Sequence, residues 1–575
     1  MRSRSILPRL EWLRSYRRAY LPHDVFAGIV LTAILVPAGM GYAEASGLPP
    51  IVGLYASIVP LLAYAVLGPS RILVVGPDSA IVPLIAVAIV PLAAGDEARA
   101  VALAGLLSII VGVVILAAAI ARLGFLTDLL SAPVRRGYLN GIALIVIVSQ
   151  LPKLFGFSIE GDGLVDDLRA FVVAVAAGAT NAATLAIGSA CLVVIIVLRR
   201  WRPSIPGVFV AVVGATIISA VLDLAGRFGV AVVGELPVGL PPVGLPAIEV
   251  GDILALVPAA LGIALVSATD MTVLSRAFAL RRGEEVSQDR ELLALGGANL
   301  AAGFFSGMPI SSSASRTPVA EAAGAQTQLT SVVGAGAIAI MLVALPSLLV
   351  NLPASTLAAV VIAAGISLID VRSIVRLWQV GSSEFWLALA SFLGVAIVGV
   401  IEGVFLAVAL SLLAFVRRAW WPHDAVLGRA DGVKGYHDLT YYPDARQVPG
   451  LILYRFDAPL FFANADVFRD RIRERIADAE TPVRWVVIAA EPMTDVDTTA
   501  AAMLDSLEEE LTAAGINLAF AELKDPVRER LRRYGAIGRV PDEMIFPTVG
   551  TAVSGYIKAT GAAWTDWEEG PSERP

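Results

Sequence analysis

The chain has 575 residues, of which 57% are hydrophobic and only 16% are charged, with a formal net charge of −7 at pH 7. Soluble domains carry about 25% charged residues. The low charged fraction of this chain and its mean hydropathy of +0.76 therefore exclude an ordinary soluble globular protein. Cys191 is the single cysteine and lies in an apolar stretch, and the three histidines are scattered, so the sequence shows no metal-ligand spacing. We therefore expect no metal, no cofactor and no enzyme chemistry.

Residues 1–23 form an Arg-rich stretch without the apolar core and small-residue cleavage site of a secretory signal, and we expect a retained cytoplasmic arm there. Residues 24–420 are a succession of apolar stretches, each near the 20 residues that a bilayer core of about 30 Å requires. This pattern predicts a polytopic α-helical membrane protein with about fourteen transmembrane segments, which start near residues 24, 50, 77, 98, 133, 182, 205, 251, 289, 311, 327, 353, 382 and 399.

The loops between these segments differ in charge. With the N-terminus inside, basic residues concentrate in the loops of the cytoplasmic side, among them the pairs Arg135-Arg136, Arg199-Arg200 and Arg281-Arg282. The positive-inside rule supports this orientation. We expect both termini to be cytoplasmic and the protein to lie in the lipid bilayer of the inner (plasma) membrane.

The composition changes after residue 420. Following a linker at 421–445, residues 446–560 alternate short β-rich apolar runs with amphipathic helical runs, which is typical of an α/β domain with a mostly parallel sheet. The domain is acidic, which argues against nucleic-acid binding. Residues 561–575 have the composition of a polar tail.

One apolar segment in the first half is broken. VVGPDSAIVPLIAV, residues 74–87, opens on Gly76-Pro77 and places Asp78 at the start of its apolar run. A helix from Asp78 to Leu92 would span only about 22 Å, less than the hydrocarbon core. We therefore expect a half-helix that begins inside the membrane near Asp78.

The second half contains a comparable segment, GFFSGMPISSSASRTPVAEAAGA, at residues 303–325. Two short, Gly/Pro-interrupted segments in corresponding positions predict an inverted repeat of seven plus seven segments. The N-termini of the two half-helices would converge on an anion site, with Arg316 as a full positive charge and serines as neutral donors. Arg316 could instead be a structural counter-charge. Asp78 could cap its helix, pair with Arg316 or act in transport, since it would repel a nearby anion.

A further acidic residue, Asp270, lies about midway along the apolar segment that starts near Asp252. An ionisable group at membrane depth is costly and should face a cavity or a partner. Asp270 could exchange a proton, bind Na⁺ with backbone carbonyls, or form a static pair with Arg316.

With these motifs the chain resembles the SulP family of anion transporters and exchangers. The first half carries PAGMGYAEASGLPP, GLYAS, GPSR and VVGP, and the second half carries EL, GGAN, GMP, SSSASRT and GAQTQL, all in the family's order. The C-terminal domain is similar to a STAS domain, whose mark is present as MTDVDTTAAAML at 493–504. In related STAS proteins from signalling, the residue after the Asp is phosphorylatable, which maps onto Thr498. A helix N-cap formed by Asp497 or Thr498 is the simpler alternative.

The resemblance implies roles for individual residues. In the family's Na⁺-bicarbonate branch a hydroxyl residue follows the acidic residue by four positions, and here that position is Leu274, so protons are favoured over Na⁺. The family also implies core and gate domains, an elevator movement and a homodimer. Carried onto this chain, the substrate-binding residues are Tyr42, Gly76, Pro77, Asp78, Ser79, Ser313, Ala314, Ser315 and Arg316, the coupling-ion residues are Asp270, Thr272 and Ser275, and the regulatory residues are Asp497 and Thr498.

The sequence therefore predicts a secondary active transporter of a small anion, with sulfate:H⁺ symport as the favoured activity. Bicarbonate driven by Na⁺ or H⁺, a C4-dicarboxylate, and anion exchange are the runners-up. The rival from another class is a membrane-anchored signalling protein, in which the STAS domain and an unknown cytoplasmic partner are the output.

Overall fold

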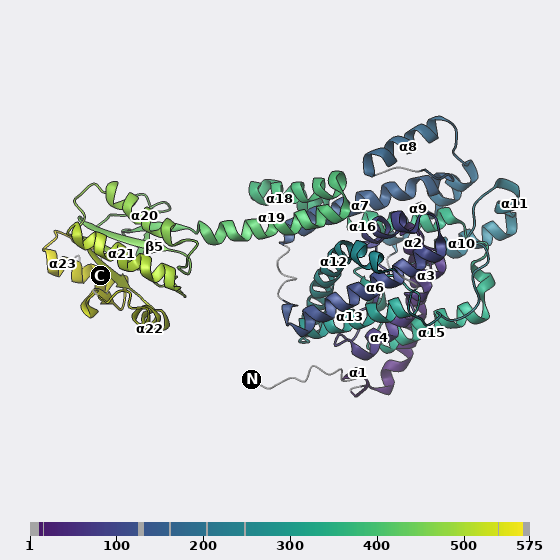
Figure 1. The fold of residues 1–575 in the computed structure, drawn as a ribbon, viewed down its shortest axis with the longest axis horizontal. Helices are drawn as coiled ribbons and strands as arrows, with labels where there is room; N and C mark the ends of the chain where they lie inside the picture. The colour runs from purple at the N-terminus through teal and green to yellow at the C-terminus, as the bar shows by residue number, and fades with distance from the viewer. Residues whose placement is uncertain are drawn as a thin grey trace, which may run out of the picture. The chain divides into compact units, whose positions relative to one another are not determined.

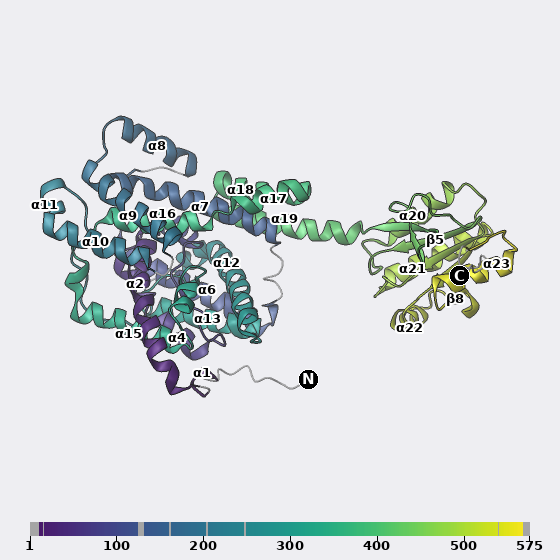
Figure 2. The same cartoon turned by 180° about the vertical axis from the view of Figure 1, so that it is seen from behind.

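The computed structural model describes residues 11–14, 16–124, 131–159, 163–202, 205–246, 249–538 and 540–566. Residue contacts divide the chain into two compact units, Met1–Leu412 and Leu413–Pro575. Figures 1 and 2 show that the first is built almost wholly of helices and the second of helices around a sheet. Residues 1–10 and 15 of the predicted arm, and residues 567–575 of the predicted tail, lie outside the described residues.

The helices of the first unit follow one another with short connections. Its elements are α1 (Glu11–Arg14), η1 (Arg18–Tyr20), α2 (Leu21–Ala45), α3 (Pro50–Tyr55), α4 (Val59–Leu67), β1 (Val75–Gly76), α5 (Val82–Ala93), α6 (Glu97–Ile120), α7 (Ala132–Phe155), α8 (Leu164–Ala176), α9 (Ala182–Trp201), α10 (Gly207–Leu222), α11 (Leu224–Phe228), α12 (Val250–Arg282), α13 (Gln288–Phe304), β2 (Ser311–Ser312), α14 (Arg316–Ala322), α15 (Leu329–Ala344), η3 (Pro346–Leu349), α16 (Ala354–Leu368), α17 (Val371–Val380), α18 (Ser382–Leu393) and η4 (Gly394–Val398), and α19 (Val400–Trp420) follows.

The polytopic α-helical membrane fold is confirmed. Within the described part of the chain, eight helical stretches are long and apolar enough to cross a bilayer, and four shorter apolar helices accompany them. Each predicted segment start lies within a few residues of a helix start or of one of the two short strands. The number of membrane crossings stays a prediction. The sequence did not predict α8 and α17, because acidic residues open α8 and two arginines interrupt the apolar pattern of α17.

Glycines allow the helices of the first unit to pack closely. A Cβ atom on Gly303 of α13 would lie 2.5 Å from the carbonyl oxygen of Gly105 on α6, and one on Gly53 of α3 would lie 1.9 Å from that of Gly39 on α2. Membrane helices associate through such small residues because lipid supplies no hydrophobic force between them. The backbones of these helix pairs are therefore in direct contact.

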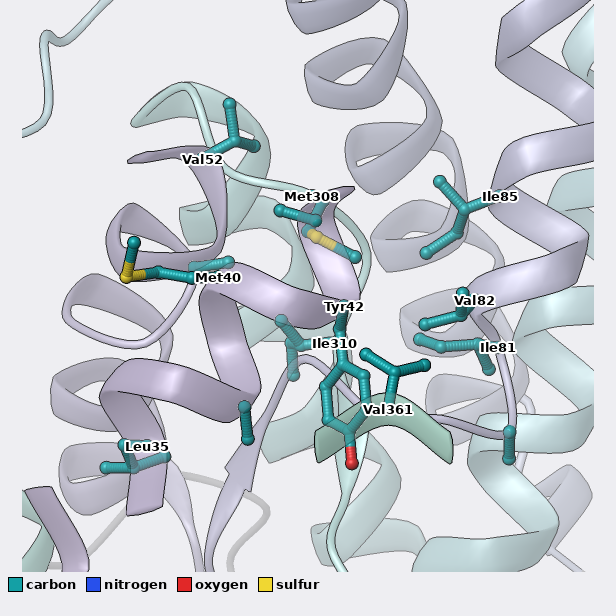
Figure 3. Packing of buried hydrophobic residues seen from close by; sticks show 14 of the residues in the cluster. Leu35, Met40, Tyr42, Val52, Ile81, Val82, Ile85, Met308, Ile310 and Val361 are labelled. Carbon is teal, nitrogen blue, oxygen red and sulfur yellow. The ribbon is translucent and has the colours of Figure 1, made fainter. Parts of the chain in front are cut away.

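The two broken segments meet at the centre of the first unit. β1 and β2 form an antiparallel pair, in which Val75 lies opposite Ser312 and Gly76 opposite Ser311. Buried apolar side chains surround this pair, and Figure 3 shows Tyr42 of α2 beside Ile310 and Val361. The inverted-repeat prediction thus places the two breaks correctly, side by side.

The helix of the first break starts later than predicted. The sequence places its start near Asp78, whereas α5 begins at Val82. The Asp78 carboxylate accepts a hydrogen bond from the N–H of Ala80 (3.1 Å), and the Asp78 carbonyl accepts one from the N–H of Ile81 (3.2 Å). An aspartate that bonds the backbone two residues ahead favours a turn over a helix. Residues 78–81 therefore form a turn and the helix follows it.

The second unit is an α/β domain, as predicted. Its sheet has the order β4-β3-β5-β6-β7-β8, in which β3 pairs antiparallel with β4 and β5, and the strands from β5 to β8 are parallel. One apolar cluster lies on each face of the sheet. The elements are β3 (Asp424–Arg429), β4 (Tyr436–Asp438), β5 (Leu451–Phe456), α20 (Ala465–Ala477), β6 (Trp485–Ala489), α21 (Thr498–Ala513), β7 (Asn517–Ala521), α22 (Asp525–Arg533), η5 (Asp542–Met544), β8 (Ile545–Phe546) and α23 (Val549–Thr560).

Two segment assignments need correction. Residues 421–445, predicted as a linker, contain β3 and β4, and Ala425 and Leu427 of β3 are buried in one of the two apolar clusters. Trp564, predicted to lie in a polar tail, packs against the same cluster, and Asp566 forms an ion pair with the buried Arg429 (3.0 Å). The folded domain therefore extends beyond both predicted ends.

Candidate functional site

Arg316 occupies the centre of the site between the two broken segments. Its side chain is only 1% exposed, and its Nε donates to the hydroxyl of Ser313 at 2.8 Å. Its Nη2 donates to the carbonyl of Pro77 on the opposite segment and lies 3.8 Å from a carboxylate oxygen of Asp78. Its Nη1 has no hydrogen-bond partner among the described residues. A buried guanidinium with a free N–H group is a strong binding feature for an oxyanion.

Gly76 is required beside this guanidinium. Its φ is +153°, and a Cβ atom there would lie 3.1 Å from Nη1 of Arg316. Glycine adopts such a φ without strain and leaves the space beside the guanidinium free. Because Gly76 has no side chain, the backbone of β1 lies close to the positive charge of Arg316.

Asp78, Tyr42 and Ser79 line the same place. Asp78 is nearly buried, and electrostatic interactions link it to Arg316 and to Tyr42. Ser79 lies beside Tyr42, and both side chains are buried. The structure thus brings together the predicted residues of the first half around Arg316 of the second.

The serines of the second break differ in their surroundings. Ser313 is buried and accepts a hydrogen bond from the backbone N–H of Arg316 (3.2 Å), the first residue of α14. Ala314 and Ser315 are exposed. Because α14 has only seven residues, its dipole is short, and the positive charge of the site comes from Arg316 itself.

Several hydroxyl groups near the site are buried without a partner. Ser311 and Ser312 of β2, and Ser267 and Thr272 of α12, have hydroxyl oxygens with no hydrogen-bond partner among the described residues. α12 packs against β2, so these residues belong to neighbouring elements. Unpaired buried polar groups are costly, and a polar ligand would satisfy them. The arrangement suits an anion that accepts hydrogen bonds.

Asp270 of α12 is the second carboxylate of the site. It interacts electrostatically with Asp78, which repels it, and with Arg135 of α7, which attracts it. Arg135 thus acts on the charge of Asp270 from a distance, and among the described residues Asp270 forms no ion pair with Arg316. Of the two predicted companions, Thr272 has a free hydroxyl, whereas the hydroxyl of Ser275 already donates to the carbonyl of Thr272 (3.2 Å).

A buried hydrogen-bond network around Glu291 was not predicted from the sequence. This carboxylate on α13 accepts hydrogen bonds from the hydroxyls of Tyr64 (2.6 Å) and Ser70, and it is fully buried. The side chain of Gln328 donates to the carbonyls of Ser70 and Leu73, both at 2.9 Å. An acidic residue at the start of an apolar segment was the available signal.

A second hydrogen-bond network holds β1, β2 and their flanking residues in place. The side-chain amide of Asn299 donates to the carbonyl of Ile310 (3.1 Å) and accepts from its N–H group (2.9 Å). The hydroxyl of Thr317 accepts from the N–H of Val74 (3.1 Å), and the N–H of Ser313 donates to the carbonyl of Val74 (3.0 Å). These bonds satisfy backbone groups that two-residue strands would leave unpaired.

The two residues predicted to be regulatory lie in the C-terminal domain, far along the sequence from the residues of the anion site. Asp497 caps α21, since its carboxylate accepts from the N–H groups of Ala500 and Phe462, both at 2.8 Å. Thr498 is the first residue of that helix and is exposed. Among the described residues, no group of three His, Cys, Asp or Glu side chains could hold a metal ion.

Comparison with known proteins gives consistent matches. A profile of the Sulfate permease family matches residues 21–391, and a profile of the STAS domain matches residues 442–552. A probable sulfate transporter of Mycobacterium tuberculosis is 43% identical to this chain over 97% of this chain and 99% of its own length. The chloroplastic sulfate transporter 4.1 of Arabidopsis thaliana is 30% identical over 96% of this chain and 82% of its own.

Two solved structures share the fold. The murine anion transporter Slc26a9, in its inward-facing state, superposes with a TM-score of 0.87 at 24% identity, over 96% of this chain and 94% of its own. The transmembrane domain of the cyanobacterial bicarbonate transporter BicA superposes with a TM-score of 0.59 at 22% identity, over 69% of this chain and 98% of its own.

Proposed function

We propose, from the premise that this chain belongs to the sulfate permease family and ends in a STAS domain, that it is a secondary active transporter which carries sulfate together with protons. The family consists of transporters and not of enzymes, and its members carry anions. The observation that supports an anion site in this chain is the free Nη1 of the buried Arg316 between the two broken segments.

Sulfate is favoured among the anions because the relatives that match over nearly the whole chain bear the name of sulfate transporters. Bicarbonate is the second candidate, since BicA shares the fold of the membrane part. C4-dicarboxylate transport and anion exchange rank below these two. A role as a membrane-anchored STAS signalling protein fits less well, because a sensor has no need for a buried arginine between two complete half-sites.

Asp270 is the proposed coupling residue. It lies on α12, the helix that packs against β2, and its charge interacts with that of Asp78 in the anion site. Leu274 stands where a hydroxyl residue would assist Na⁺ binding, and Ser275 already uses its hydroxyl within the helix. Both observations favour protons over Na⁺.

The remaining proposals concern the assembly. We place the protein in the inner (plasma) membrane with both termini in the cytoplasm, on the basis of the charge of its loops. We further propose about fourteen crossings, core and gate domains, an elevator movement and a homodimer. The STAS domain would then face a cytoplasmic partner, and Thr498 is exposed at a helix start where phosphorylation would add charge.

Transport into proteoliposomes tests the proposal. The full chain is reconstituted, and uptake of labelled sulfate, bicarbonate and fumarate is measured with an imposed inward gradient of H⁺ or of Na⁺. Asp270→Asn removes the proposed coupling charge, and Asp252→Asn, on the same helix and paired with Arg99 at 2.9 Å, is the matched control. We expect a proton gradient to drive sulfate uptake, Asp270→Asn to abolish this drive, and Asp252→Asn to retain it.

Other results would overturn parts of the proposal. If only loading with a counter-anion drives flux, the protein is an exchanger and Asp270 is structural. Uptake of bicarbonate or fumarate in place of sulfate would change the substrate. If no anion moves under any condition, the signalling role is the better account.

A further inference from the structure

Asp78 stands in the anion site with the same sign of charge as the proposed substrate. Its carboxylate lies 3.8 Å from Nη2 of Arg316, and both side chains are nearly buried. The other charged groups around it are Asp270 from α12, which Arg135 of α7 attracts, and the ionisable Tyr42 from α2. Arg316 and Asp78 thus oppose each other directly, and the formal charge of this buried pair without a substrate is zero.

A divalent oxyanion would add two negative charges to this neutral, buried place. Burying charges in a low-dielectric site is strongly unfavourable unless a partner compensates them. Arg316 hydrogen-bonds both broken segments, and Asp78 already lies against it. The substrate and Asp78 therefore compete for one guanidinium.

Asp78 is held in place while this competition occurs. Its carboxylate accepts the N–H of Ala80 within the turn that precedes α5, and Pro77 before it restricts the backbone. A carboxylate fixed in this way loses its charge by binding a proton more readily than by moving away. Neutral Asp78 would still occupy its position, but would no longer compensate Arg316.

We propose that Asp78 is a built-in counter-ion of Arg316, and that an entering divalent oxyanion takes over this role while the Asp78 carboxylate stays in place and takes up one proton from the solution. This inference rests on the proposed function and assigns a specificity role to Asp78. A monovalent anion brings one negative charge and a divalent anion brings two. Proton uptake by Asp78 therefore makes the affinity for divalent anions depend on pH more strongly than the affinity for monovalent anions. Together with Asp270, the site could take up two protons for one divalent anion, which leaves the net charge unchanged.

Equilibrium binding of labelled sulfate to the purified full chain tests the inference. The dissociation constant is measured from pH 6 to pH 8 for the wild type, Asp78→Asn, Asp78→Ser and the control Asp252→Asn, with thermal unfolding as a check of folding. Serine keeps an oxygen that can accept the N–H of Ala80, so it preserves the turn if asparagine does not. Asp252 is buried, pairs with the partly exposed Arg99 at 2.9 Å, and lies outside the site.

We expect sulfate binding of the wild type and of Asp252→Asn to weaken as the pH rises. Asp78→Asn or Asp78→Ser should bind sulfate at least about tenfold more tightly than the wild type at pH 8, with a pH slope smaller by one proton per sulfate. Folded variants with the wild-type slope, or folded variants that lose binding, overturn the role of Asp78 alone. A wild type that binds no sulfate at any pH overturns the proposed substrate and this inference with it.

Discussion

Replacing Arg316 by alanine removes the two Nη groups that face the anion site. Nη1 is free and Nη2 lies between Pro77 and Asp78, so an anion could accept one hydrogen bond from each. Hydrogen bonds to charged groups contribute about 1.5–3 kcal/mol each. The loss of both therefore amounts to roughly 3–6 kcal/mol, or about a 10²- to 10⁴-fold weaker affinity for the anion.

The assay is the initial rate of sulfate uptake into proteoliposomes over a range of sulfate concentrations. Arg316→Ala should show no saturable uptake up to concentrations at least about 100-fold above the wild-type KM. Arg316→Lys retains the charge without the planar fork and should recover part of the affinity. Arg372→Ala, at an exposed arginine of α17, is the control and should behave as the wild type. A folded Arg316→Ala variant whose KM lies within threefold of the wild type would refute the assignment of the site.

Two further predictions concern stability. A methyl group at Gly53 would lie 1.9 Å from the carbonyl oxygen of Gly39, so Gly53→Ala should destabilise the purified chain by about 1–3 kcal/mol or more and lower its Tm. Gly336→Ala is the control, because its methyl group would meet nothing within 4 Å and should leave the Tm unchanged. Equal Tm values for the two variants would contradict the close packing of α2 and α3. In the C-terminal domain, hydrogen bonds from Arg473 (2.9 and 2.6 Å) lower the pKa of Glu510 below its ordinary value. A depressed folded-state pKa adds stability above the unfolded-state pKa and loses it as the pH falls through the folded-state value. Glu510→Gln should therefore destabilise the domain by less than about 1 kcal/mol at pH 7 and have no effect in strongly acidic buffer, as urea denaturation would measure; a pH-independent loss would contradict this cause.

The two breaks in the membrane segments could be predicted because glycine and proline act locally. Gly76-Pro77 and the Gly/Pro/Ser-rich stretch before Arg316 interrupt apolar runs, and such interruptions are visible in any window of the sequence. The pairing of the breaks has no local signal. β1 and β2 have two residues each, and the bond from Val74 to Thr317 joins residues 243 positions apart.

The polar residues that support the site were harder to predict than those that form it. Arg316, Asp78 and Asp270 stand out because a charge in an apolar run is rare. Glu291 and Asn299 carry the same signal more weakly, since they lie near the start and in the middle of a segment that also contains other polar residues. Their partners are hydroxyls, amides and backbone groups of distant segments, and only the folded structure identifies these.

The hydrogen-bond networks of the two breaks restrict how the site can open to the two sides of the membrane. A displacement of the first break relative to the second would break the β1–β2 pairing and the bonds of Val74 to Ser313 and Thr317, and it would separate Arg316 from Pro77. These groups are buried, and each one left without a partner costs about 1–3 kcal/mol. No such network of buried backbone bonds joins the described residues of the breaks to α7 or α16. We therefore expect the two half-sites to move as one body, together with α13, against α7 and α16, which is the behaviour that an elevator movement requires.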